Sequence, residues 1–356
     1  MFAADLVKAL TEFGLRQYIA VLRSAGGLDV PYEAPVTRIR SGPEIPGLRL
    51  NPIRVFDLAR LVRRLRPDVV QAHGGEALKY ALAASPRMRS PIVYRRIGSI
   101  HGWTRPGLRR SGHGMLMRRA SRVITLSCAM SRETVETLGV PADRVLLLPN
   151  AVDFQRIRAS TSASITRSTL GIREAAPLIV WIGSLSHEKN PLAAVAVAGM
   201  VASDVVFALV GDGPLAERVR TNIERLGLGG RVSLLGTRTD VGNLLQLCDA
   251  LLVTSRTEGV PGVIIEAGMH GVPVVSFQVG GVGDVVIHGD TGLLAAPGDL
   301  VSLANSLTSI IRDTELKKRL GSAARARCSS AFDIRAVAPG YFNVYQELAG
   351  QRQCSA

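Results

Sequence analysis

Glu258 and Glu266 bracket a stretch rich in glycine and proline, Gly259-Val260-Pro261-Gly262. An apolar, strand-like run over residues 250–254 precedes this stretch, and a helical pattern over residues 263–270 follows it. The stretch therefore lies at the carboxyl end of a strand, which is where open α/β sheets bind their ligands. Glycines let a ligand approach the backbone, the helix start offers N–H groups to an anion, and carboxylates accept hydrogen bonds from hydroxyls. These features together predict a ligand that carries both phosphate and sugar.

Three other glycine-rich turns follow strand-like runs in the same half of the chain. The first, residues 183–190, contains Gly183, Ser184 and Lys189 and precedes a helix that begins with proline. The second, residues 210–214, contains Asp212, and the third covers residues 280–284. A lysine near a helix start is common by chance, and turn geometry alone can explain the glycines. Three such turns beside the acidic pair nevertheless favour a phosphate-bearing ligand.

The elements that must position these residues alternate between strands and helices. In the second half, we expect strands over residues 178–182, 205–210, 232–235, 250–254, 272–277 and 292–294, and helices over residues 191–202, 214–226, 241–247, 263–270 and 300–311. In the first half, we expect helices from Phe2 and over residues 55–65, and strands over residues 18–23, 68–72, 91–95, 122–126 and 144–148. This alternation predicts βαβ units and parallel sheets. Residues 24–50, rich in proline, glycine and arginine, predict an excursion with only short structure.

The length of the chain, 356 residues, exceeds what one ordinary core supports and predicts two domains. We place residues 1–153 in the first domain and residues 154–334 in the second. Residues 335–356 are expected to form a C-terminal helix that packs back on the first domain. The predicted fold class is α/β, with two doubly wound, Rossmann-like domains that face each other across a cleft.

The second half of the chain resembles the nucleotide-sugar-binding half of a retaining glycosyltransferase of the GT-B fold, closest to glycosyltransferase family 4. The resemblance rests on the Glu-x7-Glu signature with Gly259 and Gly262, the loop over residues 183–189, the Gly-Asp-Gly-Pro turn over residues 211–214, and residues 236–240. It spans about residues 60–348 and is densest over residues 177–300.

The resemblance also implies roles for individual residues. Glu258 would contact hydroxyls of the donor sugar, and Glu266 would contact the ribose of the nucleotide. Lys189 would bind the diphosphate, and Gly262 and Val263 would offer it backbone N–H groups. Gly183, Ser184, Asp212 and Gly259 would line the same site, with Arg238 beside the base. The donor substrate would be a nucleoside-diphosphate sugar of the UDP or GDP type, and no cofactor is expected.

Two departures from the family pattern affect these expectations. Many members carry arginine where Ser184 stands, so Lys189 would have more phosphate charge to balance. Members also open with a strand and a glycine-rich loop ahead of the helix at which this chain begins, so we expect the first domain to lack its first strand, through truncation or a misassigned start. Its neighbours in the sheet would then be unpaired.

A histidine near the donor sugar is common in the family, after the strand that here covers residues 91–95. No histidine stands in residues 92–98, and His101 is the nearest candidate for a catalytic role. His73, which follows the expected strand over residues 68–72, is the second candidate. The alternative for both is an ordinary loop histidine.

The excess of basic residues lies in the first half of the chain. Residues 1–150 hold 24 Lys and Arg against 11 Asp and Glu, or +13, and the remainder holds 19 against 18, or +1. One cluster contains Arg63, Arg64 and Arg66, and another surrounds Trp103 and Met115-Leu116-Met117 with Arg105, Arg109, Arg110, Arg118, Arg119 and Arg122. Such faces suit an anionic membrane surface. We expect no nucleic-acid partner, because no recognised binding signature is present. A solvated basic face without a partner is the alternative.

Several functional classes are disfavoured by what the sequence lacks. It has no Asp-x-Asp motif for a metal clamp on a diphosphate, and its four cysteines have no metal-ligand spacing. It has neither a long apolar run nor a signal-peptide pattern, so we expect a cytoplasmic protein that can attach to the inner membrane face.

The resemblance implies hexosyl transfer with retention, and the lack of an Asp-x-Asp motif indicates that the reaction is metal-independent. We expect Glu258, Lys189 and His101 to be the catalytic residues. The acceptor would be a hydroxyl of a lipid-linked sugar, a glycolipid or a polysaccharide precursor. The alternatives are a nucleotide-sugar epimerase of the same fold and a non-catalytic sugar-nucleotide-binding protein.

Overall fold

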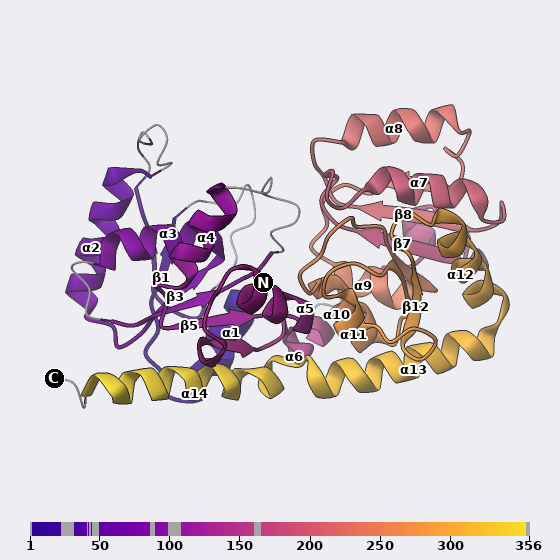
Figure 1. The fold of residues 1–356 in the computed structure, drawn as a ribbon. Helices are drawn as coiled ribbons and strands as arrows, with labels where there is room; N and C mark the ends of the chain where they lie inside the picture. Colours follow the sequence, from indigo (N-terminus) through magenta and orange to yellow (C-terminus); the bar gives the residue numbers. More distant parts are fainter. Residues whose placement is uncertain are drawn as a thin grey trace. The chain divides into compact units, whose positions relative to one another are not determined.

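The computed structural model describes residues 2–22, 32–40, 42, 44, 50–85, 90–98, 108–159 and 165–353. They form two compact units, which Figure 1 colours along the sequence. Unit 1 comprises Met1–Pro149 and Ile334–Ala356, and unit 2 comprises Asn150–Asp333. His101 and Trp103, named above as a candidate catalytic residue and as part of a basic cluster, lie outside the described residues.

Unit 2 is built around a six-stranded parallel sheet with the strand order β12-β11-β10-β7-β8-β9. Its strands are β7 (Leu178–Ile182), β8 (Val206–Val210), β9 (Val232–Leu234), β10 (Ala250–Val253), β11 (Val274–Phe277) and β12 (Gly292–Ala295). Its helices are α6 (Phe154–Ala159), α7 (Pro191–Met200), α8 (Ala216–Arg225), α9 (Val241–Leu247), α10 (Gly262–His270), α11 (Val282–Val285), α12 (Leu300–Arg312) and α13 (Thr314–Ala331).

The strand order of unit 2 reverses between β7 and β10. From β7 the chain proceeds to β8 and β9 on one side, and from β10 to β11 and β12 on the other. Helices cover both faces of such a sheet, so its strands are mostly apolar, and every residue of β10 and β11, including Ser276, is buried. The chain leaves β7 and β10 toward opposite sides of the sheet, and in doubly wound folds such a reversal is the usual ligand site.

The described residues of unit 1 form two separate parallel sheets, one of two strands and one of four. β1 (Ile19–Val21) pairs with β2 (Val36–Arg38), and β3 (Val70–His73), β4 (Ile92–Arg95), β5 (Arg122–Thr125) and β6 (Val145–Leu147) follow one another in order. Its helices are α1 (Phe2–Thr11), α2 (Pro52–Leu65), α3 (Gly74–Ala84), α4 (Leu108–Met117), α5 (Cys128–Arg132) and α14 (Ile334–Gln353). Among the described strands, β1 pairs only with β2, and β3 pairs only with β4.

Helix α14 supplies aromatic side chains to the interior of unit 1. Tyr341 is fully buried and accepts a 3.1 Å hydrogen bond from Nε of Arg95 at the end of β4. Phe342 stacks on Phe13 with ring centroids 4.8 Å apart, and Tyr345 donates a hydrogen bond to Gln71. The final helical segment of the chain is therefore part of the core of unit 1.

Several helices differ from the sequence-based expectation. Helices α3, α4, α5, α6, α11 and α13 were not predicted, and α14 is longer than the helical stretch that the aromatic residues indicated. β2, which is three residues long, agrees with the short structure expected within residues 24–50. Among the described helices, none is long and apolar enough to cross a bilayer.

Candidate active site

Two loops of unit 2 meet where the strand order reverses, one after β7 and one after β10. The backbone N–H of Arg256 donates to the carbonyl oxygen of Glu188 at 2.8 Å. The hydroxyl of Thr254 lies 3.2 Å from the carbonyl oxygen of Lys189, and Nε1 of Trp181 donates to that hydroxyl at 2.9 Å. A buried polar network thus fixes the backbone of the lysine loop to the end of β10.

Lys189 and Glu258 form the charged centre of this junction. Nζ of Lys189 lies 2.5 Å from Oε1 of Glu258, and the buried Ser255 donates its hydroxyl to the same oxygen at 2.6 Å. The side chain of Glu258 is 8% exposed, whereas that of Lys189 is 31% exposed. The carboxylate is therefore held in one orientation, while the ammonium group remains accessible to an anion.

Glycines at this junction let backbone segments pack directly on one another. Gly280 has φ +51°, and a Cβ on it would overlap the carbonyl oxygen of Glu258. A Cβ on Gly281 would overlap the carbonyl oxygen of Gly259. A Cβ on Gly211, where φ is +133°, would overlap the carbonyl oxygen of Gly183. These three glycines are required by the protein itself, because no side chain fits between the loops.

Gly183 and Gly262 are not required in this way. A Cβ on Gly183 would meet Trp181 at 3.4 Å, and one on Gly262 would have Asn150 at 3.7 Å as its nearest neighbour, which are ordinary contact distances. Neither residue has a positive φ. Their lack of a side chain is therefore unexplained by packing, and it suits the close approach of a ligand to the backbone.

Helix α10 begins at Gly262, directly after the loop that carries Glu258. The preceding residue, Pro261, has no side chain that caps the helix, so the first N–H groups, those of Gly262 and Val263, are available to an anion. Nδ2 of Asn150 donates to the carbonyl oxygen of Val260 at 3.0 Å and holds the loop at this position. The site can bind a phosphate-bearing sugar, because the ammonium group of Lys189 and the start of α10 attract the phosphate and the carboxylate of Glu258 accepts hydrogen bonds from hydroxyls.

Two families cover nearly the whole chain. Residues 1–156 match Glycosyltransferase Family 4, and residues 163–327 match the glycosyl transferases group 1. The 2-deoxystreptamine N-acetyl-D-glucosaminyltransferase of Streptomyces fradiae is 32% identical over 323 residues, which cover 82% of this chain and 74% of that protein. The chain belongs to glycosyltransferase family 4. It is a group 1 glycosyltransferase of the GT-B fold, and it transfers a sugar from a nucleotide sugar.

Two further proteins are similar to this glycosyltransferase. The Anabaena protein HepE, solved in complex with UDP and glucose, superimposes on this chain with a TM-score of 0.83 and is 25% identical to it. The match covers 97% of this chain and 96% of the HepE chain. The UDP-Gal:alpha-D-GlcNAc-diphosphoundecaprenol alpha-1,3-galactosyltransferase of Escherichia coli is 24% identical over 277 residues, covering 74% of this chain and 71% of that protein.

The second glutamate of the glycosyltransferase signature lies one turn into α10. Oε1 of Glu266 is 4.0 Å from Nη2 of Arg156 on α6, and its side chain is partly exposed. Arg238 instead pairs with Asp240, with bonds of 2.8 Å from Nε and 2.6 Å from Nη2. The backbone N–H of Gly211 donates to the carbonyl oxygen of Gly236 at 2.8 Å, which places the Arg238 loop beside the turn after β8.

Ser184 and Asp212 make local hydrogen bonds. The hydroxyl of Ser184 lies 3.2 Å from that of Ser186, and Oδ1 of Asp212 accepts from the N–H of Gly213 at 2.7 Å. The carbonyl oxygen of Asp212 accepts from Leu185 at 2.9 Å, which joins the two turns. Within the described residues, no group of three or more His, Cys, Asp or Glu side chains is arranged to hold a metal ion.

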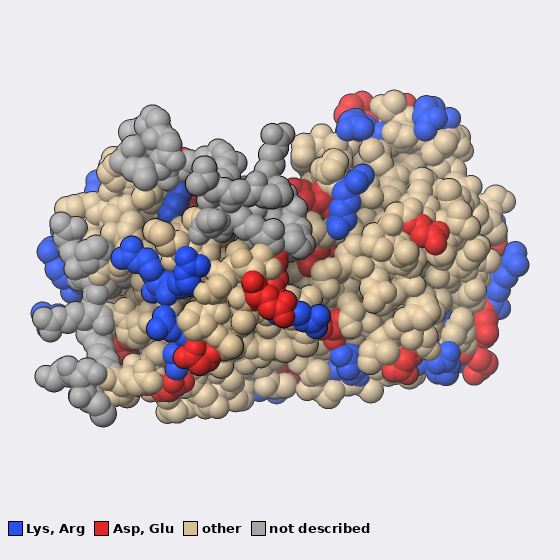
Figure 2. Space-filling view, viewed as in Figure 1, with Lys and Arg blue, Asp and Glu red and all other residues tan. Residues whose placement is uncertain are grey.

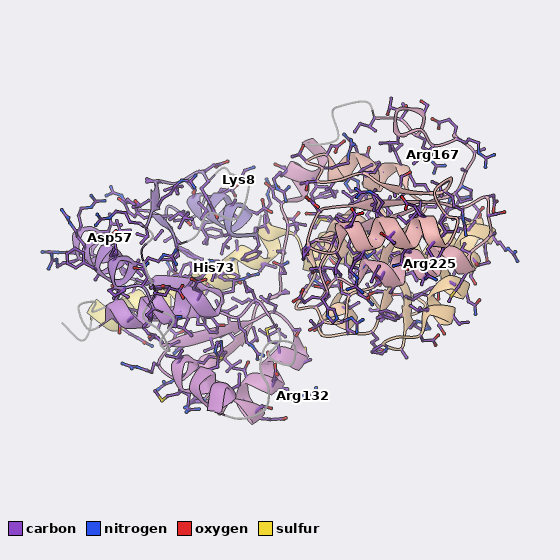
Figure 3. The ribbon with its side chains drawn as sticks, turned by 90° about the horizontal axis from the view of Figure 1, so that it is seen from above. Lys8, Asp57, His73, Arg132, Arg167 and Arg225 are labelled. Carbon is purple, nitrogen blue, oxygen red and sulfur yellow. The ribbon has the colours of Figure 1, made fainter. Side chains whose placement is uncertain are left out.

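His73 ends β3 in unit 1 and is labelled in Figure 3. Its Nε2 lies 2.8 Å from Nε2 of Gln71, and its ring lies 6.5 Å from that of Phe2. Burial, followed by the nearby charge of Arg95, lowers the pKa of His73 to about 3. The ring is therefore neutral at physiological pH, and the catalytic role considered for it stays a prediction.

We expect the His73→Gln variant to lose less stability in acid than the wild type. A histidine whose pKa is lower in the folded state binds a proton on unfolding. His73 therefore lowers the free energy of unfolding progressively as the pH drops below 6.5 toward 3. Between pH 6.5 and 5.0 the wild type should lose up to about 1.5 kcal/mol more than the variant. Urea denaturation at both pH values measures this, and equal losses would contradict a neutral His73.

His113 on α4 is the histidine that the sequence reasoning missed. A Cβ on Gly75, at the start of α3, would lie 2.9 Å from its Nε2, so the ring rests directly on this glycine backbone. Burial, with a smaller effect of Arg96, lowers the pKa of His113. The glycine pair after His73 was the available signal, because it marks where a ring can approach the backbone.

Proposed function

We propose that this enzyme is a metal-independent, retaining glycosyltransferase that uses a UDP-sugar as its donor. The observation that carries the proposal is the Lys189–Glu258 pair at the strand reversal, next to the start of α10. An ammonium group and unpaired N–H groups can balance the charge of the diphosphate without a metal. The complex of HepE with UDP and glucose supports this nucleotide over GDP.

Each site residue has a proposed role in this reaction. Lys189 and the N–H groups of Gly262 and Val263 stabilise the diphosphate as its bond to the anomeric carbon breaks. Glu258, fixed by Ser255, accepts hydrogen bonds from hydroxyls of the donor sugar, and Glu266 accepts them from the ribose. Gly183, Ser184, Asp212 and Gly259 line the site, and Arg238 borders the base. The acceptor oxygen bonds to the anomeric carbon as the bond to the diphosphate breaks, and the proton of the acceptor hydroxyl passes to the departing phosphate oxygen, which leaves as UDP. Catalysis rests mainly on orientation and charge stabilisation.

The donor half of the proposal rests on unit 2, and the acceptor half on unit 1. We propose an acceptor hydroxyl on a lipid-linked sugar or polysaccharide precursor at an anionic membrane face. The charge of +13 on residues 1–150 supports this choice, as does the E. coli relative that is named for a diphosphoundecaprenol-linked substrate. Figure 2 shows basic side chains grouped on the drawn face of unit 1, whereas those of unit 2 alternate with acidic ones. His101 keeps its proposed catalytic role, and attachment to the inner membrane face would be peripheral.

Donor turnover in the presence of EDTA tests the metal-independent mechanism. We expect UDP release from a panel of UDP-sugars to be unchanged when EDTA is added, because Lys189 and the start of α10 supply the positive charge. The measurement is coupled detection of UDP with a lipid-linked acceptor, with GDP-sugars as the comparison.

Three results would contradict the proposal. Loss of turnover on chelation, restored by Mg²⁺ or Mn²⁺, would show that the diphosphate needs a metal. Release of UDP with an altered free sugar and no acceptor would favour an epimerase. Donor binding without turnover for any acceptor would indicate a non-catalytic binding protein.

A further inference from the structure

Helix α10 begins without a capping side chain of its own. Pro261, the residue before it, has neither a side chain that binds the first N–H groups nor an N–H group to donate. The N–H groups of Gly262 and Val263 are the ones to which we assign the diphosphate. Their direction therefore depends on contacts that other segments of unit 2 make with the loop before the helix.

Asn150 supplies such a contact at the start of α10. Its Nδ2 donates a 3.0 Å hydrogen bond to the carbonyl oxygen of Val260, which lies two residues before Gly262. The same nitrogen would be 3.7 Å from a Cβ on Gly262, so the amide group lies beside the first residue of the helix. Val260 is buried and Asn150 is partly buried, so water would not fully replace this bond.

The segment that begins with Asn150 is itself anchored within unit 2. The backbone N–H of Val152 donates to the carbonyl oxygen of Phe332 at 3.1 Å. Asp153 is 5% exposed, and its Oδ1 accepts hydrogen bonds of 2.9 Å and 3.2 Å from two backbone N–H groups in the first turn of α6. The amide of Asn150 therefore extends toward α10 from a backbone that other contacts hold in place.

The same segment contacts α10 a second time, one turn further along the helix. Nη2 of Arg156 lies 4.0 Å from Oε1 of Glu266, the residue that we assign to the ribose. Asn150, in contrast, binds the loop that joins Glu258, assigned to the donor sugar, to the start of the helix. The N–H groups next to this loop would meet the phosphate that carries the sugar. The two contacts of the segment should therefore affect different parts of the donor.

We propose that Asn150 is a positioning residue for the phosphate that carries the donor sugar. By holding the carbonyl group of Val260, it fixes the direction in which the N–H groups of Gly262 and Val263 point. The proposal rests on the proposed function, which assigns the diphosphate to the start of α10. It adds the residue that gives this site its preference for a nucleoside diphosphate over a nucleoside monophosphate.

Calorimetric titration with UDP and with UMP tests the role of Asn150. UMP lacks the phosphate that carries the sugar, so the ratio of the two dissociation constants measures the contribution of that phosphate. We expect Asn150→Ala to bind UDP about tenfold more weakly, the effect of losing one partly buried hydrogen bond, and to bind UMP like the wild type. Asn150→Leu, which fills the volume of the amide without its donor group, should show the same loss.

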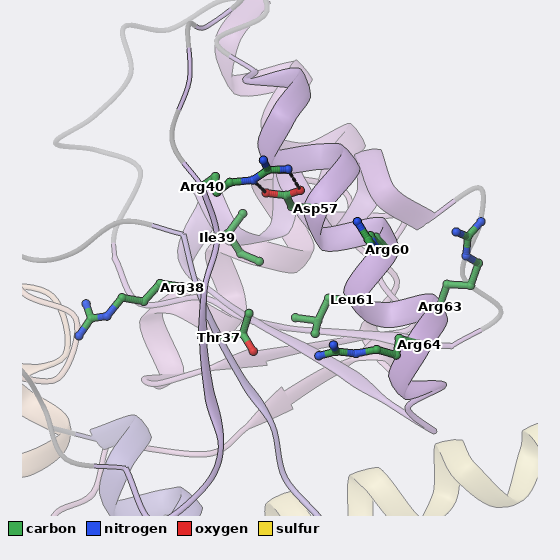
Figure 4. A pocket seen from close by; sticks show the side chains of 9 residues that line it. All are labelled: Thr37, Arg38, Ile39, Arg40, Asp57, Arg60, Leu61, Arg63 and Arg64. Carbon is green, nitrogen blue, oxygen red and sulfur yellow. Dashed lines mark hydrogen bonds and ion pairs between the residues drawn. The ribbon is translucent and has the colours of Figure 1, made fainter.

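Three control variants should keep the ratio of the wild type. Asn222→Ala removes an exposed amide from α8, where Nδ2 donates to the carbonyl oxygen of Arg218 at 3.1 Å. Arg40→Gln breaks the Arg40–Asp57 pair of unit 1, whose two hydrogen bonds are drawn in Figure 4. Arg156→Gln acts at the ribose, which UDP and UMP share, so it should weaken both equally.

Several outcomes would overturn the proposal. In the two Asn150 variants, equal losses of UDP and UMP affinity would show a general loosening of the site, and no loss would show that the bond to Val260 is not needed. A loss in Asn150→Ala alone would show that the amide only fills space. A lower ratio in Arg156→Gln would show that the segment acts on the site as a whole.

The GDP and GMP pair is measured in the same way, which separates this proposal from the proposed function. A wild type that prefers GDP would contradict the UDP-sugar donor, and the GDP to GMP ratio would then test Asn150. A wild type that prefers UDP to UMP, with the same ratio in both Asn150 variants, would overturn the role of Asn150 and leave the proposed donor in place. A wild type with no preference for either diphosphate would overturn both.

Discussion

The Lys189→Met variant is expected to lower kcat for sugar transfer by about 10²- to 10³-fold, the usual loss when one group that stabilises transition-state charge is removed. Lys189 is the exposed cation of the junction between the β7 and β10 loops, and by our proposal no metal shares its task. Lys318→Ala, which removes an exposed lysine from α13, is the control and should leave kcat unchanged. Steady-state kinetics with a UDP-sugar measures both variants.

Removing Lys189 also leaves Glu258 without its partner, so a structural effect must be separated from a catalytic one. Glu258 is 8% exposed, and an uncompensated carboxylate there should cost about 2 kcal/mol of stability. The double variant Lys189→Met/Glu258→Gln removes both charges, so we expect most of that stability to return. Transfer should remain as low as in the single variant. Recovery of transfer together with stability would show that the pair serves only to hold the two loops together.

The Gly280→Ala variant is expected to destabilise unit 2 by about 3 kcal/mol. The residue has φ +51°, which costs a side chain roughly 1–2 kcal/mol, and the new Cβ would overlap the carbonyl oxygen of Glu258. A loss of this size lowers Tm by roughly 10 °C in a unit of this length. The displaced backbone carries Glu258, so donor affinity should fall as well. Calorimetric unfolding and UDP binding measure the two effects.

Gly262→Ala is the matched comparison for Gly280→Ala. Its Cβ would be 3.7 Å from Asn150, so Tm should stay close to that of the wild type. The methyl group would instead lie at the start of α10, where we propose that the diphosphate approaches the backbone. We therefore expect weaker UDP binding with unchanged stability. Unchanged UDP affinity would show that the diphosphate does not approach Gly262.

The elements that sequence reasoning predicted most closely are those with a continuous apolar pattern. β7 and α9 have the predicted bounds. β7 is a short apolar run between Pro177 and Gly183, which leaves few alternatives, and α9 carries its leucines at helical spacing after Asp240. α3 begins with Gly74 and Gly75, which disfavour a helix. The buried face of α13 consists mostly of small residues, Gly321, Ala324 and Cys328, with Leu320 as its one large member. Its contact with α10 is close, because a Cβ on Gly268 would overlap Sγ of Cys328, and the apolar pattern is correspondingly weak.

Candidate site residues could be named from sequence where they follow a strand. Lys189 and Glu258 are 69 residues apart, and the rule that ligands bind at the carboxyl ends of parallel strands brought them together before any distance was known. The contacts that fix them could not be foreseen. Thr254 bonds to the backbone of Lys189, and Asn150 bonds to that of Val260, through side chains whose types are common in turns. Such bonds depend on the packing of distant segments, which periodicity does not report.

The sequence order of the two units has a consequence for how the chain folds as it is made. Unit 2 is one uninterrupted stretch, whereas unit 1 is completed only by α14, whose Tyr341 is buried in it. Synthesis proceeds from the N-terminus, so the ribosome releases all of unit 2 before the last helix of unit 1. The half that carries Lys189 and Glu258 can therefore mature first, and the basic half must wait for the final residues of its own core.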